Sequence, residues 1–381
     1  MIPSIRSFLR PTSLLLSLTL VCLIFIGRRA HVHKNRVHIL QPDLYRMSTV
    51  GPAHLLLLPD KIGQFCDAHG FQEYDESRHG PRPRRLYDLF LISTELDWLE
   101  IRLHTLSPYV DYFVIVESRT TFTGLEKPAY LEENWARFAA FHHKIIHRVV
   151  EDPGEAVGSR TWDHEDYMRN ALFDSVFPGL SGTEEEPQNG DVLIVGDIDE
   201  VTKPETLFVL RKCAIPERLT LRSHFYYYSF QWLHRGDQWA HPQATIYKGI
   251  SSTISPKDLR NGEGPHGWFF LGDLQRWWQK SEIWNASWHC SSCFATVAEM
   301  QAKMNSFSHS PLNTEGNRDG ATIVERVRNG LDLFGRPTEI YDRVENNQDV
   351  PGYIKHHSQR FGYLLDRDGP NAGFTDVAVD G

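Results

Sequence analysis

The stretch that decides the fold is Asp191-Val192-Leu193-Ile194-Val195-Gly196-Asp197-Ile198-Asp199-Glu200. Its four consecutive apolar residues predict a buried strand at 192–195 that ends at Gly196. If the chain stays extended beyond this strand, Asp197 and Asp199 project to the same side. Two carboxylates at the carboxyl end of a buried strand suit Mg²⁺ or Mn²⁺ carrying a diphosphate. A solvated turn at the end of a strand is the alternative for the same residues.

Strands and helices alternate on both sides of this stretch. Apolar runs predict further strands at 86–92, 112–116 and 145–150. Leu96, Leu99, Leu103 and Leu106 share one helical face, and an amphipathic helix is expected around 168–176. A capping box over 94–97 and a cap at Thr202 predict two helix starts. This order predicts an α/β fold, with a mostly parallel sheet and helices on both faces.

Polar side chains follow three of the predicted strands. Glu95 comes after the first, Glu117 after the second, and Asp197 and Asp199 after the fourth. Because ligands bind beyond the carboxyl ends of such strands, these residues predict a nucleotide-binding cleft. Helix capping is the alternative for Glu95 and its neighbour Thr94.

Four motifs in order resemble glycosyltransferase family 17, the family of the β-1,4-mannosyl-glycoprotein 4-β-N-acetylglucosaminyltransferases. The first is Leu96-Asp97-Trp98-Leu99-Glu100-Ile101-Arg102-Leu103-His104-Thr105-Leu106 with the strand at 110–118 that follows it, and the second is Gly196-Asp197-Ile198-Asp199-Glu200. They end with Trp288-His289-Cys290-Ser291-Ser292-Cys293-Phe294 and Arg360-Phe361-Gly362-Tyr363-Leu364-Leu365-Asp366. The resemblance covers about 86–366. The stretch 225–285 has no clear match, and acceptor recognition is expected there.

The resemblance implies a single Rossmann-like nucleotide-sugar transferase domain of the GT-A type. It also implies UDP-N-acetylglucosamine as donor, Mn²⁺ or Mg²⁺ as cofactor, and a mannose of an N-glycan core or a related glycan as acceptor. Asp199 is expected to bind the metal, and Asp197 to contact the ribose or a metal-bound water. His289 is a further metal ligand in this interpretation, and a packed core histidine in the alternative one.

Two further groups of side chains are assigned roles in the transfer. The planar guanidinium of Arg169 is a candidate clamp for the diphosphate, and an ion pair with Glu165 or Asp166 is the alternative. Inversion needs one general base, for which Asp319 and Glu315 are candidates and Asp273 is a third.

The aromatic run 225–232 is expected to form one strand with Tyr226, Tyr228, Phe230 and Trp232 on the same face. Trp232 and Trp239 are assigned to the acceptor side.

The N-terminus predicts membrane attachment. An apolar run between Pro11 and Gly27 has the length of a short membrane span and is also compatible with a signal peptide. No small-x-small cleavage pattern follows it, which favours an uncleaved signal anchor. Arg28 and Arg29 mildly oppose a lumenal body under the positive-inside rule. The expected organisation is a cytosolic tail at 1–10, a single-pass anchor at 11–27, a stem at 28–83 and a lumenal catalytic domain at 84–381 in the Golgi membrane.

The cysteines favour an oxidising compartment. Outside the anchor the chain has Cys66, Cys213, Cys290 and Cys293, an even number. The CxxC spacing at 290–293 fits a redox pair, half of a zinc site or a local disulfide, and the pairing stays open. Asn285-Ala286-Ser287 is a glycosylation sequon, which weakly supports lumenal exposure.

Composition excludes some functions and leaves others open. With 41% apolar and 23% charged residues the chain can bury a substantial core. Its net charge of −9, with no basic run beyond the anchor flanks, gives no sign of a nucleic-acid partner. The sequence does not specify the oligomeric state. Two rivals to a transferase remain: a metal-dependent phosphodiester hydrolase, which normally needs more His and Asp ligands, and a sugar-binding scaffold without turnover.

Overall fold

The computed structural model describes residues 36–38, 61–78, 80, 82–154, 157–158, 160–264, 279–306 and 314–378. The strands are β1 (Arg36–His38), β2 (Gln72–Glu73), β3 (Leu86–Leu91), β4 (Tyr112–Glu117), β5 (Ile145–Val149), β6 (Val192–Val195), β7 (Glu200–Thr202), β8 (Cys213–Ala214), β9 (Arg218–Tyr227), β10 (Ser229–His234), β11 (Gln243–Ile246), β12 (Lys280–Ser291) and β13 (Tyr341–Arg343). The helices are α2 (Ile62–Ala68), η3 (Glu76–Arg78), α3 (Leu96–Leu106), α4 (Tyr130–Glu133), η4 (Trp135–Lys144), α5 (Thr161–Asp174), η6 (Phe177–Leu180), α6 (Pro204–Lys212), α7 (Pro256–Asn261), α9 (Val297–Ser306), α10 (Glu315–Arg318), α11 (Gly320–Asn329), α12 (Gly352–His356), α13 (Ser358–Phe361) and η8 (Gly362–Leu364).

An eleven-stranded sheet runs through the described part of the chain in the order β1-β12-β9-β11-β6-β3-β4-β5, with β7, β10 and β13 attached beside this path. Strands β6, β3, β4 and β5 are parallel neighbours, as the sequence predicts. Strand β11 lies antiparallel between β6 and β9, and β7, β10 and β13 add further antiparallel pairs. The prediction of a mostly parallel sheet therefore holds for one half, and the whole sheet is mixed.

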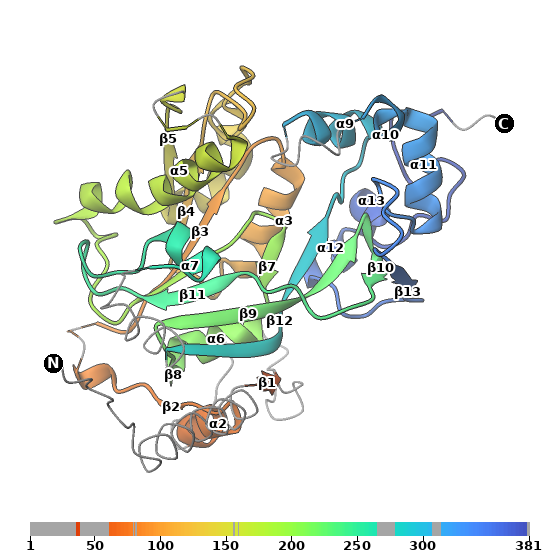
Figure 1. The fold of residues 1–381 in the computed structure, drawn as a ribbon. Coiled ribbons are helices and arrows are strands. Elements are labelled where there is room, and N and C mark those ends of the chain that lie inside the picture. The colour runs from red at the N-terminus through yellow and green to blue at the C-terminus, as the bar shows by residue number, and fades with distance from the viewer. Residues whose placement is uncertain are drawn as a thin grey trace, which may run out of the picture.

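Helices cover both faces of the parallel half, as expected (Figure 1). Alternate residues of β3 enter different cores: Leu86 and Phe90 pack with the side chains of α3 and α6, whereas Tyr87 and Leu89 pack with those of α5. Strands β4 and β6 divide their side chains in the same way. Because both faces are buried, these strands are almost wholly apolar, which is why the sequence reveals them.

The predicted single aromatic strand at 225–232 is wrong. The chain turns at Tyr228, whose φ is +65°, so the run is split between β9 and the antiparallel β10. Arg367, fully buried, stabilises this turn by donating hydrogen bonds to the carbonyls of Tyr228 and Phe294. A positive φ on a tyrosine is uncommon, and nothing in the local sequence predicts it.

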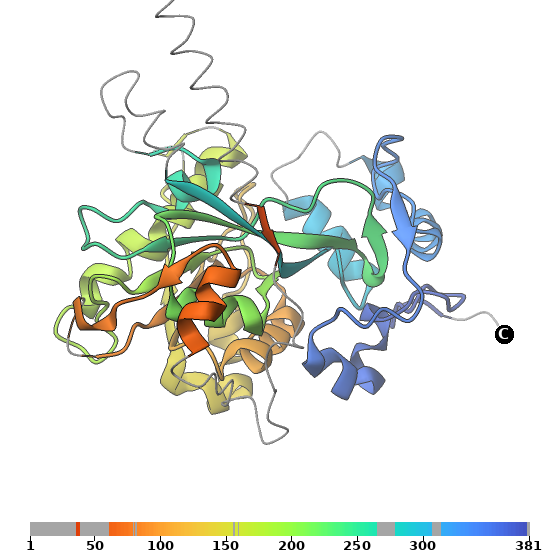
Figure 2. The same ribbon diagram turned by 90° about the horizontal axis from the view of Figure 1, so that it is seen from below.

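A third apolar core joins the hairpin to the C-terminal helices. It contains Tyr228 and Trp232 from the hairpin, Met300 from α9 and Ile323 from α11. Figures 1 and 2 place these C-terminal elements, in blue, together at one end of the molecule.

Two predicted helix caps are also wrong, although both helices are present. Helix α3 begins after Glu95, and the expected partner Asp97 instead binds Arg137 and Arg360. Helix α6 begins after Lys203, because Thr202 is still part of β7. In both places tertiary ion pairs or strand pairing compete with the local capping pattern.

The four cysteines form two disulfides, Cys66–Cys213 and Cys290–Cys293. The CxxC motif is thus a local disulfide at the end of β12. The other bond joins α2 to β8 across a sequence separation of 147 residues, and α2 lies beside α6 (Figure 2).

Removing the long-range disulfide is expected to lower stability. A bond that closes so long a loop restricts the unfolded chain strongly, so Cys66→Ser/Cys213→Ser is expected to lose about 2–5 kcal/mol of unfolding free energy. Urea unfolding followed by tryptophan fluorescence measures this loss. The matched variant Cys290→Ser/Cys293→Ser opens only a short loop and should lose less; the opposite ranking would contradict the argument.

The predicted anchor at 11–27 lies outside the described residues. Within the described ranges no helix has both the length and the apolarity that a membrane crossing requires.

Candidate active site

The segment after β6 makes a tight turn and does not stay extended. The Glu200 N–H donates to the Asp197 carbonyl at 3.0 Å, and β7 begins immediately. Gly196 is needed at the entrance, since a Cβ there would lie 2.9 Å from the Pro242 side chain. Asp197 and Asp199 therefore occupy different positions of one turn rather than one side of a strand.

A buried ion pair between α3 and β3 supports this turn. Arg102 of α3 binds Asp88 of β3 through two hydrogen bonds of 2.7 and 2.6 Å, and both side chains are fully buried. The remaining Nη1 of Arg102 donates to the carbonyls of Asp197, Ile198 and Glu200 at 2.8, 3.1 and 2.9 Å. One guanidinium thus orients three peptide groups of the turn.

Two arginines hold the Asp197 carboxylate. Its Oδ1 accepts a bond of 3.0 Å from Arg169 of α5, and its Oδ2 accepts one of 2.6 Å from Arg260 of α7. Burial alone would raise the pKa of Asp197, but the guanidinium groups of Arg260 and Arg169 hold that pKa well below its usual range. Asp197 is therefore ionised and fully paired, and its partners are the groups that bind diphosphates well.

Of the two interactions weighed for Arg169, the ion pair with Glu165 is present, and contact with a diphosphate stays a prediction. Its Nη2 pairs with Glu165 at 2.6 Å, one helical turn away, while Nη1 reaches Asp197. Asp166 instead lies near Lys257, with 3.7 Å between the Lys257 Nζ and an Asp166 oxygen. The buried Arg169 thus lies at the predicted site and is oriented by an acid on each side.

Glu200 connects the turn to an exposed tryptophan. Its fully buried carboxylate accepts from Arg260 at 2.8 and 2.9 Å, from the Asp197 N–H at 2.8 Å and from the Trp239 Nε1 at 2.7 Å. The Trp239 ring is 37% exposed, and its centroid lies 5.2 Å from that of His289. An aromatic face open to solvent thus lies next to the turn at 197–200, which is called the acidic turn below.

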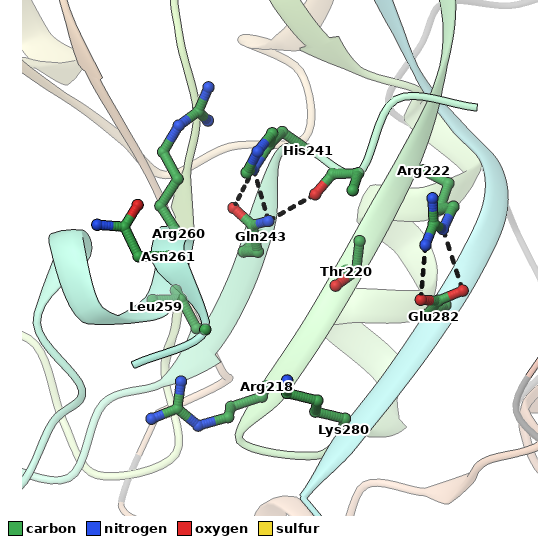
Figure 3. A pocket seen from close by; sticks show the side chains of 12 residues that line it. Arg218, Thr220, Arg222, His241, Gln243, Leu259, Arg260, Asn261, Lys280 and Glu282 are labelled. Carbon is green, nitrogen blue, oxygen red and sulfur yellow. Dashed lines mark hydrogen bonds and ion pairs between the residues drawn. The ribbon is translucent and has the colours of Figure 1, made fainter. Parts of the chain in front are cut away.

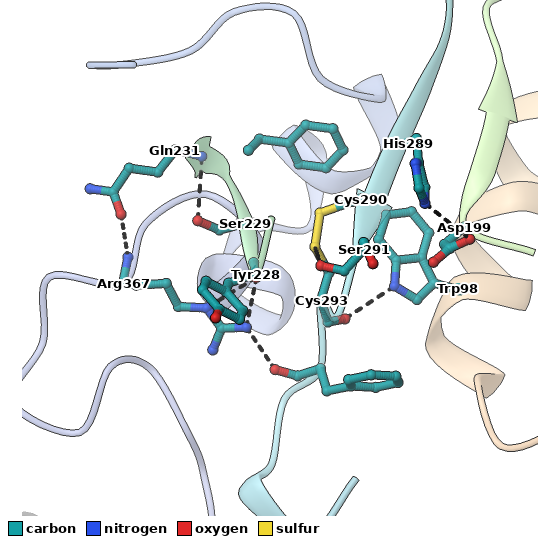
Figure 4. The surroundings of a disulfide bond; sticks show 12 residues. Trp98, Asp199, Tyr228, Ser229, Gln231, His289, Cys290, Ser291, Cys293 and Arg367 are labelled. Atoms are coloured by element: carbon teal, nitrogen blue, oxygen red, sulfur yellow. Dashed lines mark hydrogen bonds and ion pairs between the residues drawn. A yellow bond between two sulfur atoms is a disulfide. The ribbon is translucent and has the colours of Figure 1, made fainter. Parts of the chain in front are cut away.

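Asp199 is the acid of the turn whose carboxylate accepts no hydrogen bond within the described residues, and Figure 4 shows it facing His289. Among the basic side chains that the structure describes, the nearest nitrogen is the His289 Nε2, 3.8 Å from Oδ1, which is beyond hydrogen-bonding distance. Burial raises the pKa of Asp199 to about 8, and the negative charges of Asp197, Glu200 and Glu95 add to this against the opposing charge of Lys303. Without a cation, a negative charge on Asp199 is therefore unfavourable.

His289 lies on β12, and its imidazole faces the Asp199 carboxylate. Burial lowers the pKa of its imidazole to about 4, so the ring is neutral and able to act as a ligand. The backbone keeps the two residues in register, because the Cys290 N–H donates to the Asp199 carbonyl at 3.2 Å. The ring also stacks on Phe225, with centroids 4.8 Å apart, so packing fixes its orientation as well.

The residues present fit a divalent cation that is shared with a substrate. Asp199 and His289 offer an oxygen and a nitrogen donor, and Asp199 lacks charge compensation. In the described part of the chain no three His, Cys, Asp or Glu side chains gather as a complete metal site. Mg²⁺ and Mn²⁺ carrying a diphosphate take one or two protein carboxylates and fill their other positions with phosphate oxygens and water, so two donors suffice.

Glu117 lies at the end of β4, as predicted, but its carboxylate already has three partners. It accepts from the N–H groups of Leu131 and Glu132 at 3.1 and 3.0 Å and contacts the His147 Nε2 at 2.7 Å. These contacts stabilise the first turn of α4. Contact between Glu117 and a nucleotide stays a prediction. Glu95 binds Lys303 of α9 at 2.9 Å, which brings a cation toward Asp199.

The candidate bases lie on the C-terminal elements. Glu315 is exposed in the first turn of α10, and Asp319 caps α11 by accepting from the Thr322 N–H at 2.9 Å. The adjoining Arg318 carbonyl accepts a hydrogen bond from Gln301 of α9, the helix that carries Lys303. Asp273 lies outside the described residues.

Of the two tryptophans assigned to the acceptor, Trp232 is buried in the third core and Trp239 is at the acidic turn.

Three residues of the site were not predicted from the sequence: Arg102, Arg260 and Lys303. Arg260 had a usable signal, because Ser255-Pro256 is a helix start and the Ser255 hydroxyl accepts from the Asp258 N–H. Arg102 stood inside the first family motif, but its pairing with Asp88 depends on how α3 packs on the sheet.

The family model for glycosyltransferase family 17 matches residues 10–257 and 276–368. The chain therefore belongs to this family of transferases, which confirms the resemblance and the class of enzyme. Between these two ranges the model leaves 258–275 unmatched, which is shorter than the expected 225–285.

Curated relatives include the β-1,4-mannosyl-glycoprotein 4-β-N-acetylglucosaminyltransferases of human and rat. Each is 25% identical over 336 residues, which cover 81% of this chain and 61% of the relative. The chain thus spans about three fifths of the length of the relatives it matches.

Among solved structures, a mannosyltransferase from Pyrobaculum calidifontis, in complex with GDP-Man and Mn²⁺, matches with 10% identity and a TM-score of 0.33. The match covers 74% of this chain and 71% of that one. A likeness at this level establishes nothing about the ligands of this chain.

Proposed function

We propose that this chain transfers N-acetylglucosamine from UDP-N-acetylglucosamine to a hydroxyl of a glycan acceptor, such as a mannose of an N-glycan core, with inversion. The observation that carries the proposal is the acidic turn at 197–200. Asp199 lacks a close partner there, and Asp197 engages two arginines suited to a diphosphate. Family membership supports the transferase chemistry, and the curated relatives support the donor sugar.

The proposed roles follow from the contacts in the site. Asp199 and His289 would hold Mn²⁺ or Mg²⁺, and the ion would supply positive charge where the diphosphate leaves. Arg169 and Arg260 exchange Asp197 for the diphosphate oxygens, and the released Asp197 contacts the ribose or a metal-bound water. Arg102 keeps the turn in place, so these charges are oriented before the substrate arrives.

Asp319 and Glu315 are the proposed candidates for the base that deprotonates the acceptor hydroxyl. Asp319→Asn is a conservative test, because asparagine also caps helices well and α11 should be preserved. If Asp319 is the base, the variant should bind UDP-N-acetylglucosamine normally and lose transfer about 100-fold or more. Radiolabelled transfer and calorimetric donor binding measure the two properties. Unchanged transfer in this variant and in Glu315→Gln would show that neither Asp319 nor Glu315 is the base, and Asp273 would remain as the candidate.

The acceptor is proposed to stack on Trp239, whose exposed ring adjoins the turn. Trp239→Ala removes the ring, and the acceptor KM is expected to rise about tenfold, equivalent to about 1.4 kcal/mol, with little change in the donor KM. Trp239→Phe keeps an aromatic face and should retain most of the affinity. A larger effect on the donor than on the acceptor would contradict this assignment.

We further propose a Golgi membrane location with the catalytic part in the lumen. The two disulfides support an oxidising compartment. Protease digestion of the body in sealed microsomes without detergent would contradict this topology.

The test of the function itself is release of UDP from a panel of UDP-sugars with Mn²⁺ present and with a neutral glycan acceptor. UDP-N-acetylglucosamine is expected to be the preferred donor, and EDTA is expected to abolish turnover. Cleavage of unrelated phosphodiesters would favour a hydrolase, and the absence of any turnover would favour a sugar-binding scaffold.

A further inference from the structure

A turn closed by a disulfide lies directly after His289, the second of the proposed metal donors (Figure 4). It comprises residues 290–293 at the end of β12 and is called the CxxC turn below. Both of its cysteines are buried. Between them Ser292 has a φ of +56°, which is uncommon for a residue with a Cβ and persists only where the surrounding structure enforces it. The bond between Cys290 and Cys293 is such a constraint, because it joins the two ends of the turn.

The CxxC turn is hydrogen-bonded to three separate parts of the molecule (Figure 4). The bonds run from the Cys290 N–H to the Asp199 carbonyl at 3.2 Å, from the Tyr228 N–H to the Ser291 carbonyl at 3.0 Å, and from the Trp98 Nε1 to the Cys293 carbonyl at 3.1 Å. Trp98 belongs to α3, and Tyr228 is the residue at which the aromatic run turns. The position of the CxxC turn is therefore coupled directly to that of the acidic turn.

The acidic turn itself is also held by contacts that do not involve β12. Arg102 donates to three of its carbonyls, as described above. Arg260 of α7, which lines a cavity of about 270 Å³ (Figure 3), binds the carboxylates of Asp197 and Glu200. Asp199, the first proposed metal donor, thus belongs to a segment that two arginines fix from other elements.

His289 lacks the hydrogen bond that usually orients a metal-binding imidazole. Such a ring normally donates from its second nitrogen to a carboxylate or a carbonyl. The Nδ1 of His289 is buried, and among the described residues it has no hydrogen-bond partner. Stacking on Phe225 sets the plane of the ring, and the pairing of β12 with β7 ends at His289 and Glu200. The position of the Nε2 therefore depends on the backbone that follows it, which is the CxxC turn.

We infer that the Cys290–Cys293 disulfide is a positioning element of the metal site, which keeps the His289 Nε2 within reach of the ion that Asp199 would bind. This inference rests on the proposed function for the ion. The disulfide does not touch the substrate. Without it Ser292 leaves its left-handed conformation, the end of β12 shifts, and the imidazole moves away from Asp199. The loss falls on metal affinity rather than on the fold, because the two cysteines are only 3 residues apart in sequence.

The test is calorimetric titration of Mn²⁺ into the full-length chain with UDP present, for the two disulfide variants described above. Cys290→Ser/Cys293→Ser is expected to bind Mn²⁺ about tenfold more weakly or worse, as when other groups that orient metal ligands are lost. Cys66→Ser/Cys213→Ser is the matched control. It should bind Mn²⁺ like the unmodified chain, although it is expected to lose more unfolding free energy.

Three results would overturn the inference: unchanged Mn²⁺ affinity in Cys290→Ser/Cys293→Ser, an equal loss in both variants, or loss of cooperative urea unfolding in Cys290→Ser/Cys293→Ser. The last would show that the bond serves the fold instead of the site.

A spectroscopic measurement tests the position of the imidazole itself. Electron spin-echo modulation of bound Mn²⁺ detects a directly coordinated imidazole nitrogen. The nitrogen signal is expected in the unmodified chain and in Cys66→Ser/Cys213→Ser, and it should be lost in Cys290→Ser/Cys293→Ser and in His289→Gln. Its absence from the unmodified chain, or its retention in Cys290→Ser/Cys293→Ser, would reject the inference.

The function is tested apart from this inference, by UDP release from UDP-sugars. Normal UDP release in the unmodified chain together with identical Mn²⁺ binding in all variants would reject the positioning role alone.

Discussion

Replacement of Asp199 by asparagine is expected to reduce sugar transfer by at least 1,000-fold while the fold is retained. Among the described residues the Asp199 carboxylate accepts no hydrogen bond and lies 3.8 Å from the His289 Nε2, so asparagine, which has the same shape, should not disturb packing. It removes the negative charge that would hold the cation and so raises the barrier to departure of the diphosphate, and three orders of magnitude correspond to about 4 kcal/mol. UDP release with Mn²⁺ measures the loss.

The matched control is Asp342→Asn, an exposed acid paired with Arg235 far along the chain from the turn. It should keep full activity. Near-normal turnover in Asp199→Asn, or full turnover of the unmodified chain in EDTA, would refute the metal assignment.

Replacement of Arg102 by leucine is expected to cost about 3–5 kcal/mol of unfolding free energy, because it leaves the Asp88 carboxylate buried without a counter-charge. It also removes the donor for the carbonyls of Asp197, Ile198 and Glu200, so the acidic turn loses its support. Urea unfolding and donor binding measure the two consequences separately.

The double variant Asp88→Leu/Arg102→Leu separates stability from catalysis. It removes the uncompensated charge, so stability should recover in part, as is common when a buried ion pair is replaced by apolar residues. The three carbonyls still lack their donor, so transfer should not recover. Recovery of both properties together would show that Arg102 acts on stability alone.

The parallel half of the fold was predictable because its strands are buried on both faces. Val192 to Val195 and Tyr112 to Val116 consist almost wholly of apolar residues, and the leucines of α3 repeat with helical spacing. The other half, in which β9 and β12 are parallel and β7, β10, β11 and β13 pair antiparallel, was not predictable in this way. Its aromatic run turns at Tyr228, and the turn depends on the distant Arg367.

The residues of the candidate site were predictable where a local sequence pattern marks them. The acids of the turn and Arg169 were identified from local patterns, and the structure brings them together. Arg260 and Lys303 come from helices far along the chain, and their approach to the turn depends on packing across the whole sheet. A carboxylate in a sequence does not reveal which distant cation will neutralise it.

The bond between the Asp199 carbonyl and the Cys290 N–H has a consequence for synthesis of the protein. The acidic turn and its supporting Arg102 leave the ribosome about ninety residues before β12 brings His289 to Asp199. Domains fold in the order in which they are made, so the parallel half can pack while the later strands are still being translated. A nascent chain can therefore hold the folded turn with Arg102 in place and still lack His289, the second of the proposed metal donors. The proposed active site is therefore complete only after β12, which ends at the Cys290–Cys293 disulfide, has been synthesised and has joined the sheet.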